Sequence, residues 1–160
     1  MILSYQAIKA LCGRKPHLIV PFTERAVAYG LTYGLGPAGY DVRIAENLSF
    51  VVGDFKLSST LEHFWMPDDL LARVHDKSTW ARKGLFVQNT VIEPGWHGFL
   101  TLELMYHGPQ PLYLQSGTPI AQIIFERLEA PTEKPYNGRY QDQLAGPQEA
   151  IFVEEGTQNV

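Results

Sequence analysis

The sequence is poor in cysteine and has no clustered metal ligands. Cys12 is the single cysteine among 160 residues, so no disulfide bond can form within the chain. A reducing, cytoplasmic setting is therefore expected. The five histidines are too widely spaced to form the paired ligand sets of zinc proteins. These absences argue against a disulfide-stabilised fold and against a zinc enzyme.

Excess basic charge and long apolar runs are also lacking. The net charge of −4 argues against a general nucleic-acid-binding protein, although a local group of basic side chains could still bind a small anion. No apolar run approaches the ~20 residues that a membrane-spanning helix needs. The N-terminus lacks the apolar core of a secretory signal peptide, and no internal repeat is visible. We therefore expect one domain without a membrane anchor.

The sequence instead contains many short apolar segments separated by turn residues. This pattern is typical of a β-sandwich or β-barrel rather than of βαβ units. One helix is expected over residues 2–11, with Ser4 as its N-cap and Gly13 at its end. Residues 28–39 show no clear periodicity and are expected to form a loop. The expected strands cover residues 17–22, 40–44, 48–52, 55–57, 63–66, 70–75, 85–92, 99–106, 111–114 and 120–128.

The C-terminal part of the chain has a different composition. After Ala130 it becomes polar and contains proline and glycine, which predicts an extended arm over residues 130–153 and a flexible tail over residues 154–160. Residues 1–153 are expected to form the single domain. Residues 135–143 mix aromatic, cationic and amide side chains, so this arm is either a solvated tail or a flap that closes over an anionic ligand.

A polar turn over residues 76–84 gathers groups that bind anions. Lys77, Ser78, Thr79 and Arg82 supply positive charge and hydroxyl donors between two apolar segments. Backbone N–H groups in such a turn favour an anion as well. A solvated loop would have a similar composition, so both interpretations stay open at this point.

Residues 99–106 place a carboxylate on an apolar strand face. Alternate residues from Leu100 to Tyr106 should face the core, and Glu103 then lies on the opposite face between Thr101 and Met105. Desolvation disfavours the charged form and raises a carboxyl pKa, which suits a general acid–base group near neutral pH. The alternative is a surface glutamate that pairs with a cation.

A tight turn is expected just before this strand, at Pro94 and Gly95. Trp96 follows the turn. It could pack in the core or offer a stacking surface to a ring or a sugar, and taken alone it favours packing.

Four segments, in order along the chain, resemble the dCTP deaminases of the trimeric dUTPase-like superfamily. They are AGYDVR at residues 38–43, KSTWARKGL at 77–85, IEPGWHG with TLEL at 92–104, and PY with RYQDQ at 135–143. The resemblance implies a distorted β-barrel or jelly roll with a short N-terminal helix. It also implies a homotrimer with active sites between subunits.

The implied reaction is hydrolytic removal of the 4-amino group of dCTP, which gives dUTP and ammonia. The family uses no zinc, and Mg²⁺ binds through the triphosphate. Glu103 would take a proton from the attacking water and deliver protons to N3 and the leaving amine. Ser78 would hold the water or its tetrahedral product, and Arg82 would position Glu103 and bias its charge state.

The resemblance also implies which residues hold the nucleotide. Trp96 would pack against the deoxyribose and exclude a 2′-hydroxyl, and Glu93 would hydrogen-bond the sugar or the base edge. Residues 88–91 would read the pyrimidine through their backbone, and the arm would close over the triphosphate. The implied substrate-binding residues are Lys77, Thr79, Asn89, Thr90, Glu93, Trp96, Tyr136, Arg139 and Gln143.

Some positions depart from the family pattern. Glu93 replaces an aspartate, Thr79 a serine and Arg139 a lysine, and the hairpin after Arg82 is shorter. A shorter hairpin could admit a 5-substituted cytosine.

Two alternatives stay open. The first is a dUTP diphosphatase, or an enzyme with both activities, in which Glu93 activates water at the α-phosphate; the product from dCTP could then be dUTP or dUMP. The second is a non-catalytic β-sandwich that binds a nucleotide.

Overall fold

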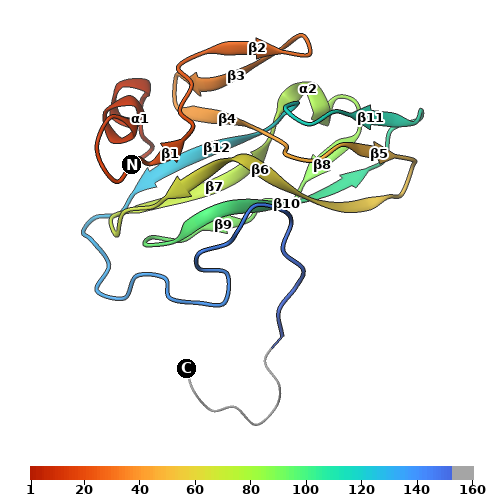
Figure 1. Cartoon of the computed structure of the whole chain (residues 1–160). Coiled ribbons are helices and arrows are strands. Elements are labelled where there is room, and N and C mark those ends of the chain that lie inside the picture. The colour runs from red at the N-terminus through yellow and green to blue at the C-terminus, as the bar shows by residue number, and fades with distance from the viewer. Residues whose placement is uncertain (153–160) are drawn as a thin grey trace.

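Two antiparallel β-sheets make up the body of the molecule (Figure 1). The structure, a computed structural model, describes residues 1–152. The larger sheet has the strand order β2-β3-β4-β12-β7-β9, and the smaller has the order β1-β6-β10-β8. Strands β5 and β11 form a separate pair. The arrangement confirms the mostly β class, and the predicted tail over residues 154–160 lies outside the described residues.

The elements are short and follow one another closely. The helices are α1 (Tyr5–Cys12) and α2 (Ser78–Ala81). The strands are β1 (Ile19–Val20), β2 (Ala26–Ala28), β3 (Leu31–Gly36), β4 (Gly39–Arg43), β5 (Leu48–Phe50), β6 (Phe55–Trp65), β7 (Leu70–Asp76), β8 (Leu85–Val87), β9 (Val91–Ile92), β10 (His97–Tyr106), β11 (Leu112–Leu114) and β12 (Pro119–Arg127).

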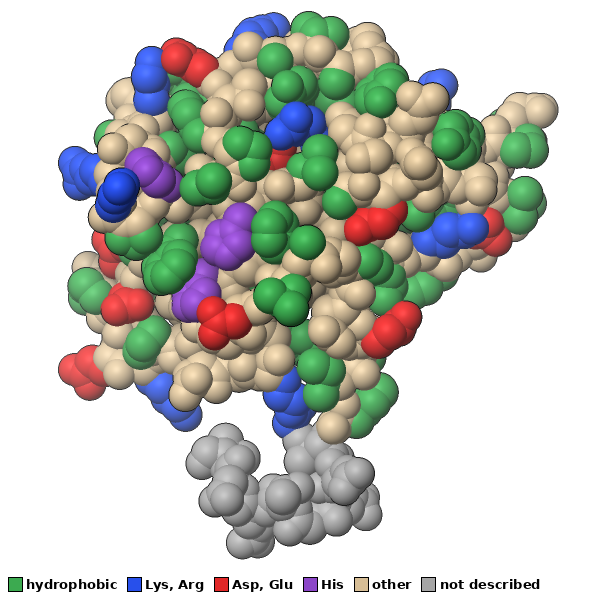
Figure 2. Space-filling view, in the orientation of Figure 1, with side chains coloured by type: hydrophobic (Ala, Val, Ile, Leu, Met, Phe, Trp, Pro, Cys, Tyr) green, Lys and Arg blue, Asp and Glu red, His purple; other side chains and the backbone are tan. Residues whose placement is uncertain are grey.

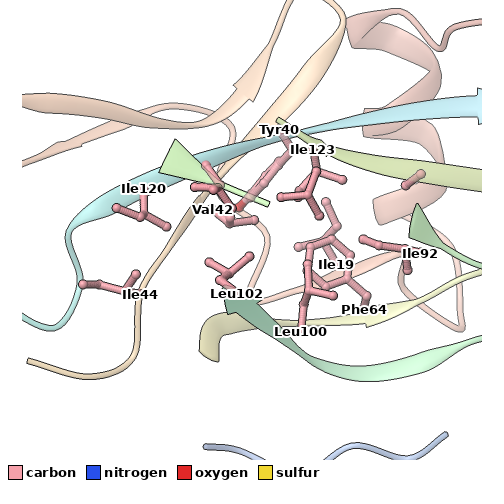
Figure 3. Packing of buried hydrophobic residues seen from close by; sticks show 14 of the residues in the cluster. Ile19, Tyr40, Val42, Ile44, Phe64, Ile92, Leu100, Leu102, Ile120 and Ile123 are labelled. Atoms are coloured by element: carbon pink, nitrogen blue, oxygen red, sulfur yellow. The ribbon is translucent and has the colours of Figure 1, made fainter. Parts of the chain in front are cut away.

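The hydrophobic core fills the space between the two sheets. In Figure 3, Leu102 of β10 and Phe64 of β6 point toward Val42 and Ile123 of the larger sheet. All four side chains are completely buried. Burial of this face holds the register of β10 on β6, because a slip by one residue would turn the leucines out to solvent.

The N-terminal helix begins later than predicted. Ile2 and Leu3 are extended, because Ile2 bridges Glu126 of β12 and the Leu3 N–H bonds the Phe125 carbonyl at 2.9 Å. Ser4 occupies the N-cap position without a side-chain cap bond. In the part of the chain that the structure describes, neither helix has the length and apolar character needed to cross a bilayer.

The prediction of a loop over residues 28–39 is wrong. The chain there forms the hairpin β2–β3, and β3 also pairs with β4. Tyr29 and Gly30 make the two-residue turn with φ values of 51° and 73°, which is the backbone that fits the twist of a hairpin. Strand β2 has only three residues and β3 contains two glycines, so the sequence shows little alternation.

The two strands predicted over residues 55–57 and 63–66 are one continuous strand, β6. Residues 58–62, between the two predicted strands, continue β6. Ser58, Ser59 and Thr60 among them are buried. The Ser58 and Ser59 hydroxyls donate to the Glu46 carboxylate at 2.6 and 2.7 Å, so the polar stretch is satisfied inside the fold.

The single strand predicted over residues 85–92 is two strands in different sheets. β8 pairs with β10 in the smaller sheet, whereas β9 pairs with β7 in the larger one. Residues 88–90 carry the chain across. The preceding polar turn, predicted over residues 76–84, contains the short helix α2.

A buried ion pair joins the two sheets and yields a stability prediction. The Arg43 guanidinium bonds Glu62 at 2.8 Å, and Glu62 is 0% exposed. Burial raises the pKa of Glu62, against the opposing effect of Arg43. We expect Arg43→Met to cost about 3–5 kcal/mol at neutral pH, because it leaves a buried carboxylate without its cation.

The deficit should shrink as the pH falls. With Arg43 gone, the folded variant holds a proton on Glu62 more readily than the unfolded chain, so acid favours its folded state. Urea unfolding at fixed protein concentration, at about pH 7 and about pH 5, measures this. Arg73→Met, which removes the surface pair with Glu126, is the matched control and should cost at most about 1 kcal/mol. Equal losses in both variants would contradict the prediction.

Candidate active site

Strand β10 places Glu103 on the outer face of the smaller sheet. Leu100, Leu102 and Leu104 are buried on the inner face, as the alternation predicted. Leu57 of β6 lies opposite Glu103 in the register of the two strands. The carboxylate therefore rises from the sheet beside an aliphatic neighbour.

The Glu103 carboxyl group has one oxygen atom without a partner. Its Oε2 atom is buried and has no hydrogen-bond partner within residues 1–152, and the same residues provide no ion pair for it. Burial raises the pKa of Glu103 above the ordinary value of a carboxyl group. The surface glutamate paired with a cation is thus not what the described chain contains. An unpartnered buried carboxylate in a protein calls for an explanation, and a group kept ready for proton transfer is one.

Glu103 lies in the wall of a pocket of about 450 Å³. Strand β10 and the segment 90–96 form part of the wall, and the arm closes another part. The predicted site residues found in this wall are Thr90, Glu93, Trp96, Glu103, Tyr136 and Gln143. Phe55, Leu57 and Leu100 give it a largely apolar surface.

The turn at Pro94 and Gly95 fastens the arm to the barrel. The Pro94 carbonyl accepts the Tyr136 N–H at 2.8 Å, and the Gly95 carbonyl accepts the Gln141 side-chain amide at 2.9 Å. Gly95 has a φ of 82°, and a Cβ there would come within 2.6 Å of Pro135. Only glycine allows both this backbone and this close approach.

Trp96 packs in the core, as the sequence taken alone favoured. Its ring is buried in the core cluster and also lines the pocket. Its indole N–H donates to the Tyr140 carbonyl of the arm. The tryptophan is therefore a packing residue that also holds the arm in place.

The arm is ordered against β10 rather than solvated. The Asp142 N–H bonds the His97 carbonyl at 3.0 Å, and the Phe99 N–H bonds the Gln143 carbonyl at 2.9 Å. Gly98 and Gln143 form a parallel bridge. Figure 1 shows the arm running along β10 before it reaches the C-terminal end of the chain.

Aromatic and histidine rings of β6 and β10 pack together next to this part of the arm. His97 forms an ion pair with Asp142 at 2.8 Å when it is protonated, and its ring stacks on Trp65 with a centroid distance of 4.3 Å. His63 meets the Phe99 ring edge-on. Figure 2 shows histidine side chains gathered among hydrophobic ones on one face of the molecule. Burial, and to a smaller extent His97, lower the pKa of His63.

The predicted residues of the segment 76–84 do not reach this pocket. Ser78, Thr79 and Arg82 are exposed on and beside α2, and none of them lines the pocket. Lys77 forms an ion pair with Asp41 of β4. Arg82 makes no ion pair with the described residues, so within one chain it does not position Glu103.

Asn89 and Arg139 also lie outside the pocket wall. Asn89 is exposed in the segment between β8 and β9. The Arg139 guanidinium bonds the Ile151 carbonyl at 3.4 Å within the arm.

The charged side chains in the pocket wall are all acidic. Glu93, Glu103 and Glu149 line it, and no lysine or arginine of the described chain does. A polyphosphate needs cationic or N–H donors. The pocket of one chain therefore offers a proton acceptor and a place for an uncharged ring, but no means of neutralising phosphates.

The structure adds residues that sequence reasoning did not select. Thr101, Tyr140 and Gln148 line the pocket beside the predicted residues. Thr101 could have been found, because it shares the strand face of Glu103 two residues away. Gln148 belongs to an arm without periodicity, so no pattern pointed to it, whereas Tyr140 lies in the RYQDQ segment and could have been selected from the resemblance. No cluster of three metal-ligating side chains is found within residues 1–152.

The chain was compared with known families and curated proteins. The sequence model of the dCTP deaminase-like family matches residues 43–128. A probable deoxyuridine 5′-triphosphate nucleotidohydrolase of Sulfolobus islandicus rod-shaped virus 1 is 37% identical over 152 residues, covering 89% of this chain and 94% of the relative. A dCTP deaminase of Pyrococcus horikoshii is 35% identical over 144 residues, covering 80% of this chain and 86% of the relative.

Solved structures agree on the fold. The 2′-deoxycytidine 5′-triphosphate deaminase of Agrobacterium tumefaciens superimposes with a TM-score of 0.63 at 19% identity. The match covers 79% of this chain and 47% of that longer chain. The EIAV dUTPase matches with a TM-score of 0.52 at 23% identity, covering 63% of this chain and 84% of that one. The fold is thus of the dUTPase-like type, and the chain belongs to the dCTP deaminase-like family.

Proposed function

We propose that this protein hydrolyses dCTP to dUTP and ammonia, with Glu103 as the acid–base group. The observation that carries the proposal is the half-buried Glu103 carboxyl group in the wall of a pocket of about 450 Å³, with a buried Oε2 atom that has no hydrogen-bond partner within the described chain. Membership of the dCTP deaminase-like family and the 35% identity to a dCTP deaminase support the same reaction. Enzymes of nucleotide metabolism commonly work in the cytoplasm, which supports the location expected from the sequence.

The proposed chemistry needs one group that both takes and gives protons. A water molecule attacks C4 of cytosine, and Glu103 accepts one of its protons as the C–O bond forms. Glu103 passes this proton to N3, then takes the remaining proton from the new C4 hydroxyl and delivers it to the amine, so that a C4 carbonyl forms, the C–N bond breaks and ammonia leaves. A carboxyl with a raised pKa suits both directions of transfer. The proposed step needs no metal-bound water.

We propose that the site is completed by a neighbouring subunit of a homotrimer. The acidic pocket wall lacks the cations that a triphosphate requires. Ser78, Thr79 and Arg82 are exposed on and beside α2 and remain unused within one chain. Placed against the pocket of the next subunit, Arg82 and Ser78 would meet Glu103 and the attacking water. Mg²⁺ would bind through the phosphates of the nucleotide, and one of the dUTPase-fold neighbours is itself described with a structural Mg(II) ion.

The apolar wall supports a further substrate preference. Leu57 and Leu100 lie in the same wall as Glu103, and C5 of a cytosine is bonded to the carbon that Glu103 must approach. We propose that a small substituent at C5, such as a methyl group, is tolerated.

A second activity is supported by a separate observation. Glu93 lines the same pocket as Glu103, and the viral relative at 37% identity is described as a probable dUTP nucleotidohydrolase. A carboxylate at this place could activate water at an α-phosphate, so that dUTP would give dUMP and diphosphate.

An assay with three nucleotides tests these proposals. The full-length protein is incubated with Mg²⁺ and dCTP, 5-methyl-dCTP or dUTP, and ammonia, dUTP, dUMP and diphosphate are followed. We expect ammonia from dCTP and from its 5-methyl analogue. Ammonia from dCTP together with diphosphate from dUTP would establish both activities. Diphosphate from dUTP without ammonia from dCTP would replace the proposed deaminase by a dUTP diphosphatase. If no nucleotide is turned over but dCTP binds in calorimetry, the non-catalytic nucleotide-binding protein is the correct interpretation.

A further inference from the structure

Within residues 1–152, Thr101 is the one side chain of β10 that two separate parts of the arm contact through hydrogen bonds. Its Oγ1 atom accepts a bond from the side-chain amide of Gln143 and another from the backbone N–H of Gln148 at 2.9 Å. A hydroxyl oxygen has two lone pairs, and these two bonds use both. Thr101 is only 9% exposed on the outer face of the sheet, because the arm covers it.

The two donors, Gln143 and Gln148, lie at the two ends of an arm segment next to the pocket. Gln143 is already paired to the strand edge through its carbonyl, which accepts the Phe99 N–H. The chain then turns away and returns at Gln148, which lines the pocket together with Glu149. The Thr101 hydroxyl therefore closes a loop of the arm over the face that carries Glu103.

A second, weaker contact lies beside the first. Ser59 is the partner of Thr101 in the register of β6 and β10, and its hydroxyl oxygen accepts the Gly146 N–H at 3.2 Å. The Ser59 hydroxyl also donates to Glu46 at 2.7 Å, which fixes its orientation. The arm loop thus rests on two neighbouring hydroxyls, of which Thr101 makes the bonds at both ends.

We propose that Thr101 is a positioning residue that holds the arm closed over the nucleotide, so that its hydroxyl determines how tightly dCTP is retained beside Glu103. The inference rests on the proposed function, since the ligand is the substrate named there. The Thr101 hydroxyl oxygen already accepts hydrogen bonds from Gln143 and Gln148, so it does not act on the reacting atoms. It acts through the arm, which must be in place for the pocket to be enclosed.

Thr101→Val tests the role, because valine keeps the shape of threonine and removes the oxygen. Each hydrogen bond contributes modestly, so loss of two should raise KM for dCTP roughly tenfold, while kcat changes less. Thr101→Ser keeps the hydroxyl and should restore KM to within about threefold of the wild-type value. Steady-state kinetics with dCTP and Mg²⁺ on the full-length protein give both parameters.

Thr118→Val is the matched control. Thr118 is 3% exposed, and its hydroxyl donates to the Gln115 carbonyl at 2.6 Å, in a turn that does not contact the arm. The control removes an equally buried hydroxyl and should leave KM unchanged. A rise of KM in Thr118→Val equal to that in Thr101→Val would overturn the positioning role, as would a failure of serine to restore KM.

Hydrogen exchange measures how firmly the arm is bound to β10, and it does not depend on turnover of a nucleotide. In Thr101→Val, the backbone amide of Gln148 loses its acceptor and should exchange at least about tenfold faster than in the wild type, in nucleotide-free protein. Unchanged exchange of the arm would overturn the inference even if KM rose. Faster exchange together with no turnover of dCTP by the wild type would instead refute the proposed function and leave the anchoring of the arm established.

Discussion

Glu103→Gln should abolish the release of ammonia from dCTP while leaving nucleotide binding nearly unchanged. Glutamine has the shape of glutamate but takes up no proton, so water at C4 loses its base and the amine loses its acid. We expect kcat to fall at least about 10³-fold, within the range that general acid–base groups contribute. Ammonia release measures the loss, and calorimetric titration with dCTP and Mg²⁺ should give a Kd within a few-fold of the wild-type value.

The variant also carries its own check on folding. The Oε2 atom of Glu103 is buried without a partner within the described chain, so replacing the carboxylate by a neutral amide should leave the thermal midpoint equal or higher. Glu93→Gln is the matched control, since it makes the same change in the same pocket wall. It should keep ammonia release within about tenfold, because an amide still hydrogen-bonds the sugar or the base edge. Normal turnover by Glu103→Gln would refute the proposed mechanism.

Two inactive variants should restore each other's activity when they share a trimer. Arg82→Ala removes the cation beside α2, and Glu103→Gln removes the acid–base group of the pocket. If these residues meet across a subunit boundary, a boundary between one subunit of each kind can contain both intact residues. Each trimer that contains both kinds of subunit has one such boundary among its three, so about a third of the wild-type activity should return in purified mixed trimers. Co-expression with two different affinity tags and sequential purification isolates the mixed trimers for assay.

The control mixture combines Ser78→Ala with Arg82→Ala. Both changes lie on or beside α2, so no subunit in that mixture carries an intact segment and no activity should return. Recovery in this control would mean that Ser78 and Arg82 serve different sites. Absence of recovery with Glu103→Gln and Arg82→Ala, in particles that carry both tags, would place the whole site in one subunit and refute the proposed assembly.

The position of Glu103 was accessible from the sequence because a strand alternates with a period of two. The leucines at residues 100, 102 and 104 had to face the core, and they do. Once that face is buried, the direction of Glu103 follows without any knowledge of its partners. Its missing hydrogen bond did not follow, because that depends on which side chains approach from elsewhere in the chain.

Polar residues inside the fold misled the sequence reasoning. Ser58 and Ser59 lie between two predicted strands that are one strand in the structure, and Glu46 satisfies their hydrogen bonds there. Glu62 is buried in the same strand because Arg43 pairs with it. Partners this far apart in sequence cannot be paired from a pattern of hydrophobicity, since the pattern marks a buried polar residue as exposed.

The sequence predicted that an extended arm exists, but it did not predict which strands and turns the arm contacts. Its contacts are made by backbone groups and by glutamine side chains, such as Gln141 and Gln143, which carry no periodic signal. The residues of α2 pose a different problem, because a single sequence does not tell which copy of the chain a side chain serves. In the trimer that we propose, Ser78 and Arg82 serve the pocket of a neighbouring subunit, and in their own chain they lie away from the pocket.

The order of synthesis gives the arm a further consequence. The last strand of the barrel ends at Arg127, and the pocket is closed by residues that the ribosome adds afterwards. The strands of the barrel are therefore all synthesised before the residues that cover the pocket. Until those residues lie on Thr101 and Trp96, the strand face that carries Glu103 is open on that side, so in each chain the cover can form only after every strand has been made.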